Sequence, residues 1–148
     1  MTKNYSIYPL ISEEQIKARI KELAAQIKKD YEGKEILAVC LLKGSLIFTA
    51  DLIRELDRDI FVDFMSVSSY GNETISSGNV KIRKDLDCDI SGKNVIIVED
   101  IVDSGLTMSK ILEVLNTRNP ASLKVCSLLN KSERREIDVK IDYVGFEI

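Results

Sequence analysis

The stretch Val95–Thr107, VIIVEDIVDSGLT, decides the fold class of this chain of 148 residues. Its first four residues form an apolar run that is typical of a strand buried on both faces of a parallel sheet. Two adjacent carboxylates, Glu99 and Asp100, come at what we expect to be the carboxyl end of that strand. After a loop of small and hydroxyl residues, apolar side chains at helical spacing predict a helix over Met108–Leu115.

The same alternation of strands and helices extends in both directions. A capping box at Ser12–Gln15, followed by apolar residues at steps of three and four, predicts a helix that runs toward Asp30. Apolar runs and helical periodicity predict strands at 36–42, 60–67, 80–83, 123–129 and 141–146, and a helix at 46–56. The polar stretch 68–79 is predicted to be a loop. This order predicts an α/β fold, a largely parallel central sheet flanked by helices, in one domain over residues 1–148.

Composition excludes several kinds of site. The chain contains no histidine, so Ser-His-Asp triads, Cys-His dyads and histidine-ligated zinc are ruled out. Its net charge of −3 argues against a nucleic-acid-binding face. The cysteines Cys40, Cys88 and Cys126 form no C-x-x-C pair and are predicted to be reduced thiols of a cytoplasmic protein. No apolar run reaches the length of a membrane span, and the N-terminus leads into no signal segment.

The loop after the central strand has the chemistry of an anion site. A tight loop that feeds a helix N-terminus directs backbone N–H groups and the positive end of the helix dipole at a ligand. Ser104 and Thr107 add hydroxyl groups, and Gly105 permits close approach of the backbone. Ligands of open α/β sheets bind at the carboxyl ends of strands, so this cradle and the carboxylates are expected to share one site. A ligand with a phosphate at one end and hydroxyls or a metal ion at the other would satisfy both.

A structural role is the alternative for these residues. Asp103 or Ser104 could simply cap the following helix, which would be the preferred interpretation for a single acid. Three acids within five residues repel one another unless a cation or hydroxyl donors compensate their charge, and this favours a functional site. Two other kinds of phosphate loop are excluded: no G-x-G occurs, and Gly92-Lys93 lacks the earlier glycine of a Walker loop.

The segment Val98–Thr107 resembles the phosphoribosyl-pyrophosphate (PRPP) loop of type I phosphoribosyltransferases, an acidic pair, two apolar residues and Asp-Ser-Gly-Leu-Thr. The resemblance to the hypoxanthine-guanine branch of that family extends over nearly the whole chain. Four more segments resemble its motifs: Leu41–Ser45 the pyrophosphate loop, Ser68–Gly71 the mobile lid, Ser127–Lys131 the strand end with the purine-reading lysine, and Tyr143–Ile148 the strand before the purine-stacking segment. This implies the type I phosphoribosyltransferase fold with a mobile lid loop.

By this resemblance, each residue of the PRPP loop has a role. Glu99 and Asp100 would hold the ribose hydroxyls and the Mg²⁺ region of PRPP. Asp103 would line the same site and act as the catalytic base at the purine N7. The cradle of the 5′-phosphate would consist of Ser104, Gly105, Leu106 and Thr107.

The remaining implied contacts come from other loops. Lys43 and Gly44 would hold pyrophosphate through a peptide that is often cis in this family, and Lys131 would bind the purine. Ser69 and Tyr70 would belong to the lid. Taken without the resemblance, Lys43 and Lys131 would be solvated lysines and Tyr70 an ordinary loop aromatic.

The implied activity is purine salvage: transfer of phosphoribosyl from PRPP to hypoxanthine or guanine, with Mg²⁺, to give IMP or GMP and pyrophosphate. The alternative is a PRPP-sensing regulator of the same fold without turnover; a transferase for another base is a further one. The family implies a homodimer or homotetramer, without nucleic-acid or membrane partners. Its purine-stacking aromatic lies past the position of Ile148, so we expect a C-terminally truncated chain that lacks the purine-binding segment.

Overall fold

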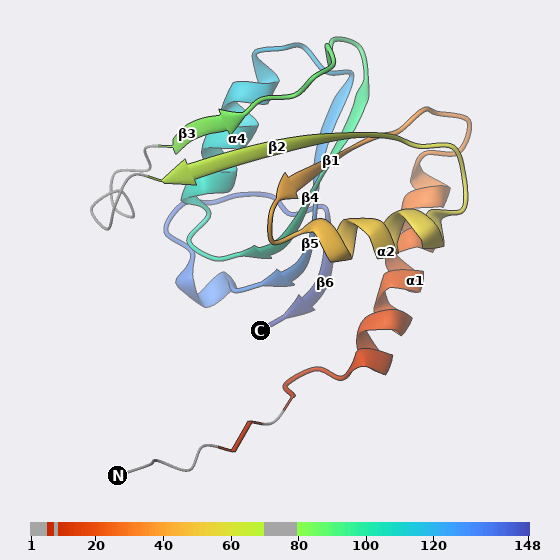
Figure 1. Ribbon diagram of the computed structural model, residues 1–148, viewed down its shortest axis with the longest axis vertical. Helices are drawn as coiled ribbons and strands as arrows, with labels where there is room; N and C mark the ends of the chain where they lie inside the picture. The colour runs from red at the N-terminus through yellow and green to blue at the C-terminus, as the bar shows by residue number, and fades with distance from the viewer. Residues whose placement is uncertain (1–5, 8, 70–79) are drawn as a thin grey trace.

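A single sheet organises the part of the chain that the computed structural model describes, residues 6–7, 9–69 and 80–148 (Figure 1). Its strands lie in the order β3-β2-β1-β4-β5-β6. Their bounds are Leu37–Leu42 for β1, Phe61–Ser69 for β2, Val80–Lys84 for β3, Asn94–Val102 for β4, Ser122–Asn130 for β5 and Tyr143–Glu147 for β6. Neighbouring strands are parallel except for β2 and β3, which pair antiparallel, so the predicted α/β class and largely parallel sheet are confirmed.

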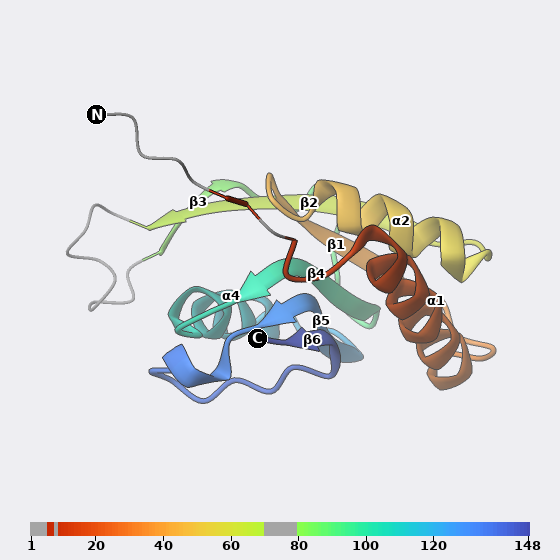
Figure 2. The same ribbon diagram turned by 90° about the horizontal axis from the view of Figure 1, so that it is seen from below.

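Helices cover both faces of the sheet. The helices α1 (Glu13–Asp30) and α2 (Leu46–Leu56) lie together on one face, and α4 (Leu106–Asn116) lies on the other (Figure 2). Successive side chains of a strand point to opposite faces, and the core divides accordingly. Ala38 of β1 packs on the side of α1 and α2, whereas Val39 packs on the side of α4. None of the helices in the described ranges is long and apolar enough to cross a membrane.

The first helix is tied to the last strand. The predicted capping box is present, with Ser12 Oγ accepting from the Gln15 amide at 3.1 Å. From α1, Arg19 donates through Nε to the Gly145 carbonyl at 2.9 Å and through a terminal nitrogen to the preceding carbonyl of β6, that of Val144, at 2.7 Å. At the other end of the helix, Tyr143 Oη donates to Asp30 at 2.6 Å. The edge strand is therefore held by hydrogen bonds to α1 as well as by its ladder with β5.

Several element bounds differ from those predicted. Strand β4 continues to Val102, so Glu99 and Asp100 belong to the strand instead of following it. Helix α4 begins at Leu106, two residues before the predicted start at Met108. Its N-cap is Gly105, whose backbone lies in the left-handed region (φ 86°). Strand β2 runs through Ser69, so residues 68 and 69 are strand and not loop as predicted. The rest of the predicted loop, residues 70–79 with lid residue Tyr70, lies outside the described residues.

The parallel pairing places three connections at one edge of the sheet. The loop after β1 carries Lys43, the loop after β4 carries Asp103, and the connection after β5 carries Lys131. Since β1, β4 and β5 are adjacent and parallel, their carboxyl ends meet there. The sheet thus gathers the predicted site residues of all three connections.

A buried aspartate fastens β2 to the connection between β3 and β4. Asp63 of β2 is 5% exposed and accepts from the amides of Phe64, Asp87 and Cys88 at 2.8, 2.9 and 3.1 Å. Burial alone would raise the pKa of Asp63, but hydrogen bonds from the Cys88 side chain and from these amides bring it below its ordinary value of 3.8. The ionised form is therefore favoured in the folded protein.

Replacing Asp63 by Ala should lower the free energy of unfolding by about 1–3 kcal/mol at pH 7, because the amides lose a charged acceptor. Asp63→Asn should do the same at pH 7. Because the folded pKa is lowered, the advantage of the wild type over Asp63→Asn is present above pH 3.8 and is lost as the pH falls below it. Denaturant melts check this, with the exposed Asp87→Ala as control. A difference between wild type and Asp63→Asn that does not change with pH would contradict it.

Candidate active site

Two carboxylates occupy the last part of β4. Strand β1 pairs with β4 only as far as Val98, and the ladder to β5 skips Asp100. The carboxylates supply acceptors where the ladders fail: Glu99 Oε1 accepts from the Asp100 amide at 2.9 Å, and Asp100 Oδ1 accepts from the Ile101 amide at 2.8 Å. Their side chains are thereby fixed against the strand.

The acidic pair carries less negative charge at neutral pH than two free carboxylates would. Burial, followed by a hydrogen bond to Asp100, raises the pKa of Glu99 to about 8. At neutral pH Glu99 therefore holds a proton, and this relieves the repulsion expected between adjacent acids. A divalent cation or the hydroxyls of a sugar can take over the role of that proton.

The loop between β4 and α4 forms an open anion cradle. Gly105 is the N-cap, without a side-chain hydrogen bond to the helix, so the interpretation of Asp103 as a helix cap is wrong. Ser104 Oγ accepts from the Leu106 amide at 3.3 Å, a weak cap from one residue before the N-cap. The acidic pair, this loop and the first turn of α4 line a pocket of about 250 Å³. Amide donors at the helix start and the positive end of its dipole suit a phosphate there.

The connection between β5 and β6 supports this cradle from behind. The carbonyl of Ser104 accepts from the amides of Glu136 and Ile137 at 2.8 and 3.2 Å. A Cβ on Gly105 would lie 2.7 Å from the Ile137 carbonyl oxygen, so no side chain fits at this position. The conformation of the phosphate loop is therefore linked to that of the connection that follows Lys131.

The loop after β1 lies directly against the acidic pair. A Cβ on Gly44 would lie 2.7 Å from Asp100 Oδ2, and this is the observation that joins the two loops into one site. Ser45 anchors the loop: it is fully buried and its Oγ donates to the Leu41 carbonyl at 2.6 Å. The cis peptide joins Leu42 to Lys43, one bond earlier than the Lys43–Gly44 peptide predicted from the sequence. Lys43 itself is exposed.

The third connection brings Lys131 to the same edge. Its amide donates to the Val102 carbonyl at 2.9 Å, at the end of β4, and its side chain is half-buried. A short 3-10 helix, η1 (Ser132–Arg134), follows it. From η1, Arg134 reaches Asp103, with 3.3 Å between Nε and Oδ1. The sequence alone gave no reason to connect Arg134 with Asp103.

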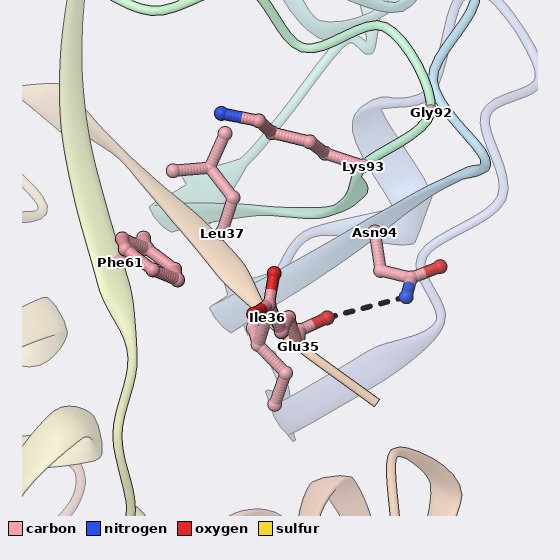
Figure 3. Close-up of a pocket in the computed structure, with 7 residues that line it drawn as sticks. All are labelled: Glu35, Ile36, Leu37, Phe61, Gly92, Lys93 and Asn94. Atoms are coloured by element: carbon pink, nitrogen blue, oxygen red, sulfur yellow. Dashed lines mark hydrogen bonds between the residues drawn. The ribbon is translucent and has the colours of Figure 1, made fainter. Parts of the chain in front are cut away.

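Another pocket, of about 280 Å³, lies at the opposite edge of the sheet, where β1, β2 and β4 begin (Figure 3). The Lys93 side chain extends across it beside Leu37 and Phe61, and Asn94 Nδ2 donates to the Glu35 carbonyl at 3.2 Å. It has no pair of carboxylates and no helix N-terminus among its lining residues. The site described above is therefore the candidate active site.

Comparison with known proteins identifies the family. Residues 11–148 match the model of the phosphoribosyl transferase domain. The chain belongs to the phosphoribosyltransferase family. It is 54% identical over 140 residues to a hypoxanthine-guanine phosphoribosyltransferase of Aquifex aeolicus, covering 94% of this chain and 79% of that protein. The hypoxanthine-guanine phosphoribosyltransferase of Bacillus subtilis is 50% identical over 139 residues, covering 94% of this chain and 77% of the relative.

Solved structures agree with this assignment. A hypoxanthine-guanine phosphoribosyltransferase from Bacillus anthracis is 52% identical and superposes with a TM-score of 0.93, covering 96% of this chain and 84% of that one. The type I fold predicted for this phosphoribosyltransferase from its motifs is thereby confirmed.

The acidic pair could hold Mg²⁺ only together with substrate. Among the described residues, no three acidic or cysteine side chains converge on one point, so the protein alone offers no full cage. Mg²⁺ is commonly held by one or two carboxylates together with substrate phosphates and water. Glu99 and Asp100 fit that mode. The raised pKa of Glu99 shows that no cation among the residues that the structure describes compensates its charge, and Asp100 lies against Gly44.

The raised pKa of Glu99 predicts how metal-free stability depends on pH. In the unfolded chain Glu99 ionises near 4.5, but in the fold only near 8, so ionisation costs stability as the pH rises between these values. Glu99→Gln should therefore raise the free energy of unfolding at pH 9 by on the order of 2–4 kcal/mol, at about 1.4 kcal/mol per pKa unit. At pH 4 it should change little.

Thermal melts in EDTA at both pH values check this prediction. Glu32→Gln, at an exposed position after α1, removes the same charge and serves as control. Equal effects of Glu99→Gln at pH 4 and pH 9 would show that Glu99 is not held protonated by the fold.

Proposed function

We propose that this phosphoribosyltransferase transfers the phosphoribosyl group of PRPP to hypoxanthine or guanine, giving IMP or GMP and pyrophosphate. The observation that carries the proposal is the close approach of Gly44 to Asp100, because it supports a single site formed by the loop after β1, the acidic pair and the loop before α4. Such a space suits a sugar with a phosphate at one end and a diphosphate leaving group at the other. The names of the relatives described above supply the purine acceptors.

The cradle of Ser104–Thr107 holds the 5′-phosphate in this proposal. The first-turn amides of α4 and the hydroxyls of Ser104 and Thr107 donate to it, and Gly105 lets it approach the backbone. Glu99 and Asp100 accept from the ribose hydroxyls. When pyrophosphate leaves C1, positive charge builds on the sugar ring, and nearby carboxylates stabilise that charge.

The leaving group is held at the other end of the site. Lys43 and the backbone at Gly44 face the diphosphate, whose negative charge grows as the bond to C1 breaks. Mg²⁺, held by Glu99 and Asp100 together with the substrate, supplies further charge neutralisation when it is bound. Fixed positive groups at this end and carboxylates at the sugar lower the energy of the charge-separated transition state.

Asp103 acts on the purine as general base. It lies between the acidic pair and the cradle, with 43% of its side chain exposed toward solvent. The carboxylate takes the proton from N7 while N9 bonds to C1. Lys131, beside the end of β4, donates to the 6-oxo group, which favours hypoxanthine or guanine over adenine. The names of the relatives favour a transferase over a regulator that only senses PRPP.

The base assignment is tested by Asp103→Asn, which keeps the size of the side chain and removes its basicity. Turnover should fall about 10²-fold or more, the loss expected for a general base, while the affinity for PRPP stays within a few-fold of wild type. Steady-state rates with hypoxanthine and guanine, combined with calorimetric PRPP titrations, separate the two effects. Asp138→Asn, an exposed acid on the β5–β6 connection, is the control. Near-normal turnover of Asp103→Asn would refute the assignment.

The acidic pair is tested by the double substitution Glu99→Gln and Asp100→Asn. Binding of PRPP in the presence of Mg²⁺ should be abolished in calorimetry, because both sugar acceptors and both metal ligands are lost. The melting temperature should be unchanged or higher, since repulsion between the acids is removed. Wild-type PRPP affinity in this variant would show that the sugar is held elsewhere.

We also propose that the chain forms a homodimer or homotetramer. A groove of about 630 Å³ runs between α1 and α2, with Ile16, Ile20 and Ile47 among its lining residues. Three acids and three bases complete the lining: Glu13, Asp51, Glu55, Lys17, Lys21 and Arg54. Such a balanced rim can pair with a second copy of itself across a two-fold axis.

We propose a cytoplasmic location as well, because the unpaired cysteines fit the reducing conditions of the cytoplasm.

Ile47 is the test of this surface because 71% of it is exposed, so its replacement leaves the protomer intact. Ile47→Asp should shift the mass in light scattering from that of an oligomer to that of the protomer. Phe61→Ser, at an apolar residue of β2 that is 61% exposed, should leave the mass unchanged. A wild-type mass equal to the protomer would exclude the proposed assembly.

A further inference from the structure

Arg134 is a charged group at the site to which neither the sequence motifs nor the mechanism above gives a role. It ends η1, on the connection between β5 and β6, and 68% of its side chain is exposed. Its Nε lies 3.3 Å from Oδ1 of Asp103, which belongs to the loop between β4 and α4. The pair therefore joins the purine side of the site to its phosphate side.

The two oxygens of Asp103 have different surroundings. Oδ1 is buried and accepts no hydrogen bond from the described residues, so the guanidinium of Arg134 is the charge that faces it. Nevertheless, 43% of the Asp103 side chain is exposed. The exposed area lies on the other atoms of the side chain, among which Oδ2 is the only acceptor.

The backbone around Arg134 is tied to the loop that carries Asp103. The amide of Arg134 donates to the Lys131 carbonyl at 3.2 Å, which closes η1. On either side of η1, the connection bonds to the loop after β4: Lys131 donates to Val102, and Glu136 donates to Ser104, the residue that follows Asp103. Both ends of the ion pair are thus mounted on one hydrogen-bonded unit, and little besides the Arg134 side chain has to be ordered to form it.

We infer that Arg134 is a positioning residue, whose guanidinium holds Oδ1 of Asp103 and leaves Oδ2 to receive the purine proton. This inference rests on the proposed role of Asp103 as base. In the step, the N7–H bond breaks and an O–H bond forms at Oδ2, while N9 bonds to C1 of the ribose. The bond from C1 to the pyrophosphate oxygen breaks, and its electron pair leaves with pyrophosphate.

A double-mutant cycle tests the inference. Because an exposed ion pair is weak, Arg134→Ala should lower kcat only about 3- to 10-fold and leave the KM for PRPP unchanged. In the Asp103→Asn background the same substitution should change kcat less than about 2-fold, because the oxygen that it positions is no longer a base. Losses that multiply would overturn the inference, since Arg134 would then act on another group.

Two further variants separate positioning from general effects. Arg134→Lys keeps a cation within reach of Oδ1 and should recover at least half of the lost kcat. Lys140→Ala removes the same charge from an exposed position of the same connection and should leave kcat unchanged. A loss in Lys140→Ala equal to that in Arg134→Ala would attribute the effect to net charge and overturn the inference.

The ion pair can also be observed without turnover. The Nε–H resonance of Arg134, assigned by its disappearance in Arg134→Lys, should shift in Asp103→Asn and stay in place in Lys140→Ala. An unmoved resonance in Asp103→Asn would overturn the inference. The two proposals fail differently: normal turnover of Asp103→Asn removes the base and with it the role of Arg134. A slow Asp103→Asn together with a fully active Arg134→Ala removes only the positioning.

Discussion

Strand β4 hydrogen-bonds to β1 along one side and to β5 along the other, and the site depends on this parallel pairing. It brings the loop after β1, the loop after β4 and the connection after β5 to one edge of the sheet, although they are far apart in the sequence. The ladder with β1 also stops at Val98, so the next residues of β4 need other hydrogen-bond partners. The acidic pair therefore lies on the part of β4 that no longer pairs with β1.

The electrostatics of the site follow from the burial of that pair. An ionised Glu99 beside Asp100 would place two negative charges in a region with little water, and the fold avoids this by raising the pKa of Glu99 to about 8. The phosphate cradle next to it is the opposite, a set of amides and a helix dipole that favour an anion. The acidic side of the site therefore favours a cation or hydroxyl donors and the cradle favours an anion, so one ligand that carries both kinds of group satisfies both sides.

Elements with strong local signals were predictable from the sequence. The capping box, the helix after the pyrophosphate loop and the buried strands were placed nearly as observed, because periodicity and cap chemistry act within a few residues. The ends of β4 and α4 were misplaced, since the polar residues Glu99 and Asp100 continue a strand whose pairing comes from β5. Nothing local indicates that Arg134 turns toward Asp103; the contact arises from the hydrogen bonds that join the two connections. The residues that line the site were predictable from the sequence, whereas the contacts that hold them in place are seen only in the folded structure.

The hydrogen bonds from Arg19 to the carbonyls of Gly145 and its neighbour have a consequence for synthesis of the chain. The ribosome completes α1 long before it makes the strand that Arg19 binds. Until β6 emerges, Arg19 and Asp30 lack the hydrogen bonds that they form with this strand in the folded protein. The side of α1 that faces β6 is then not covered by it. Contacts between segments so distant in sequence close late, so a nascent chain without β6 presents an open sheet edge to other chains. The contacts between α1 and β6 therefore form only after β6 has left the ribosome.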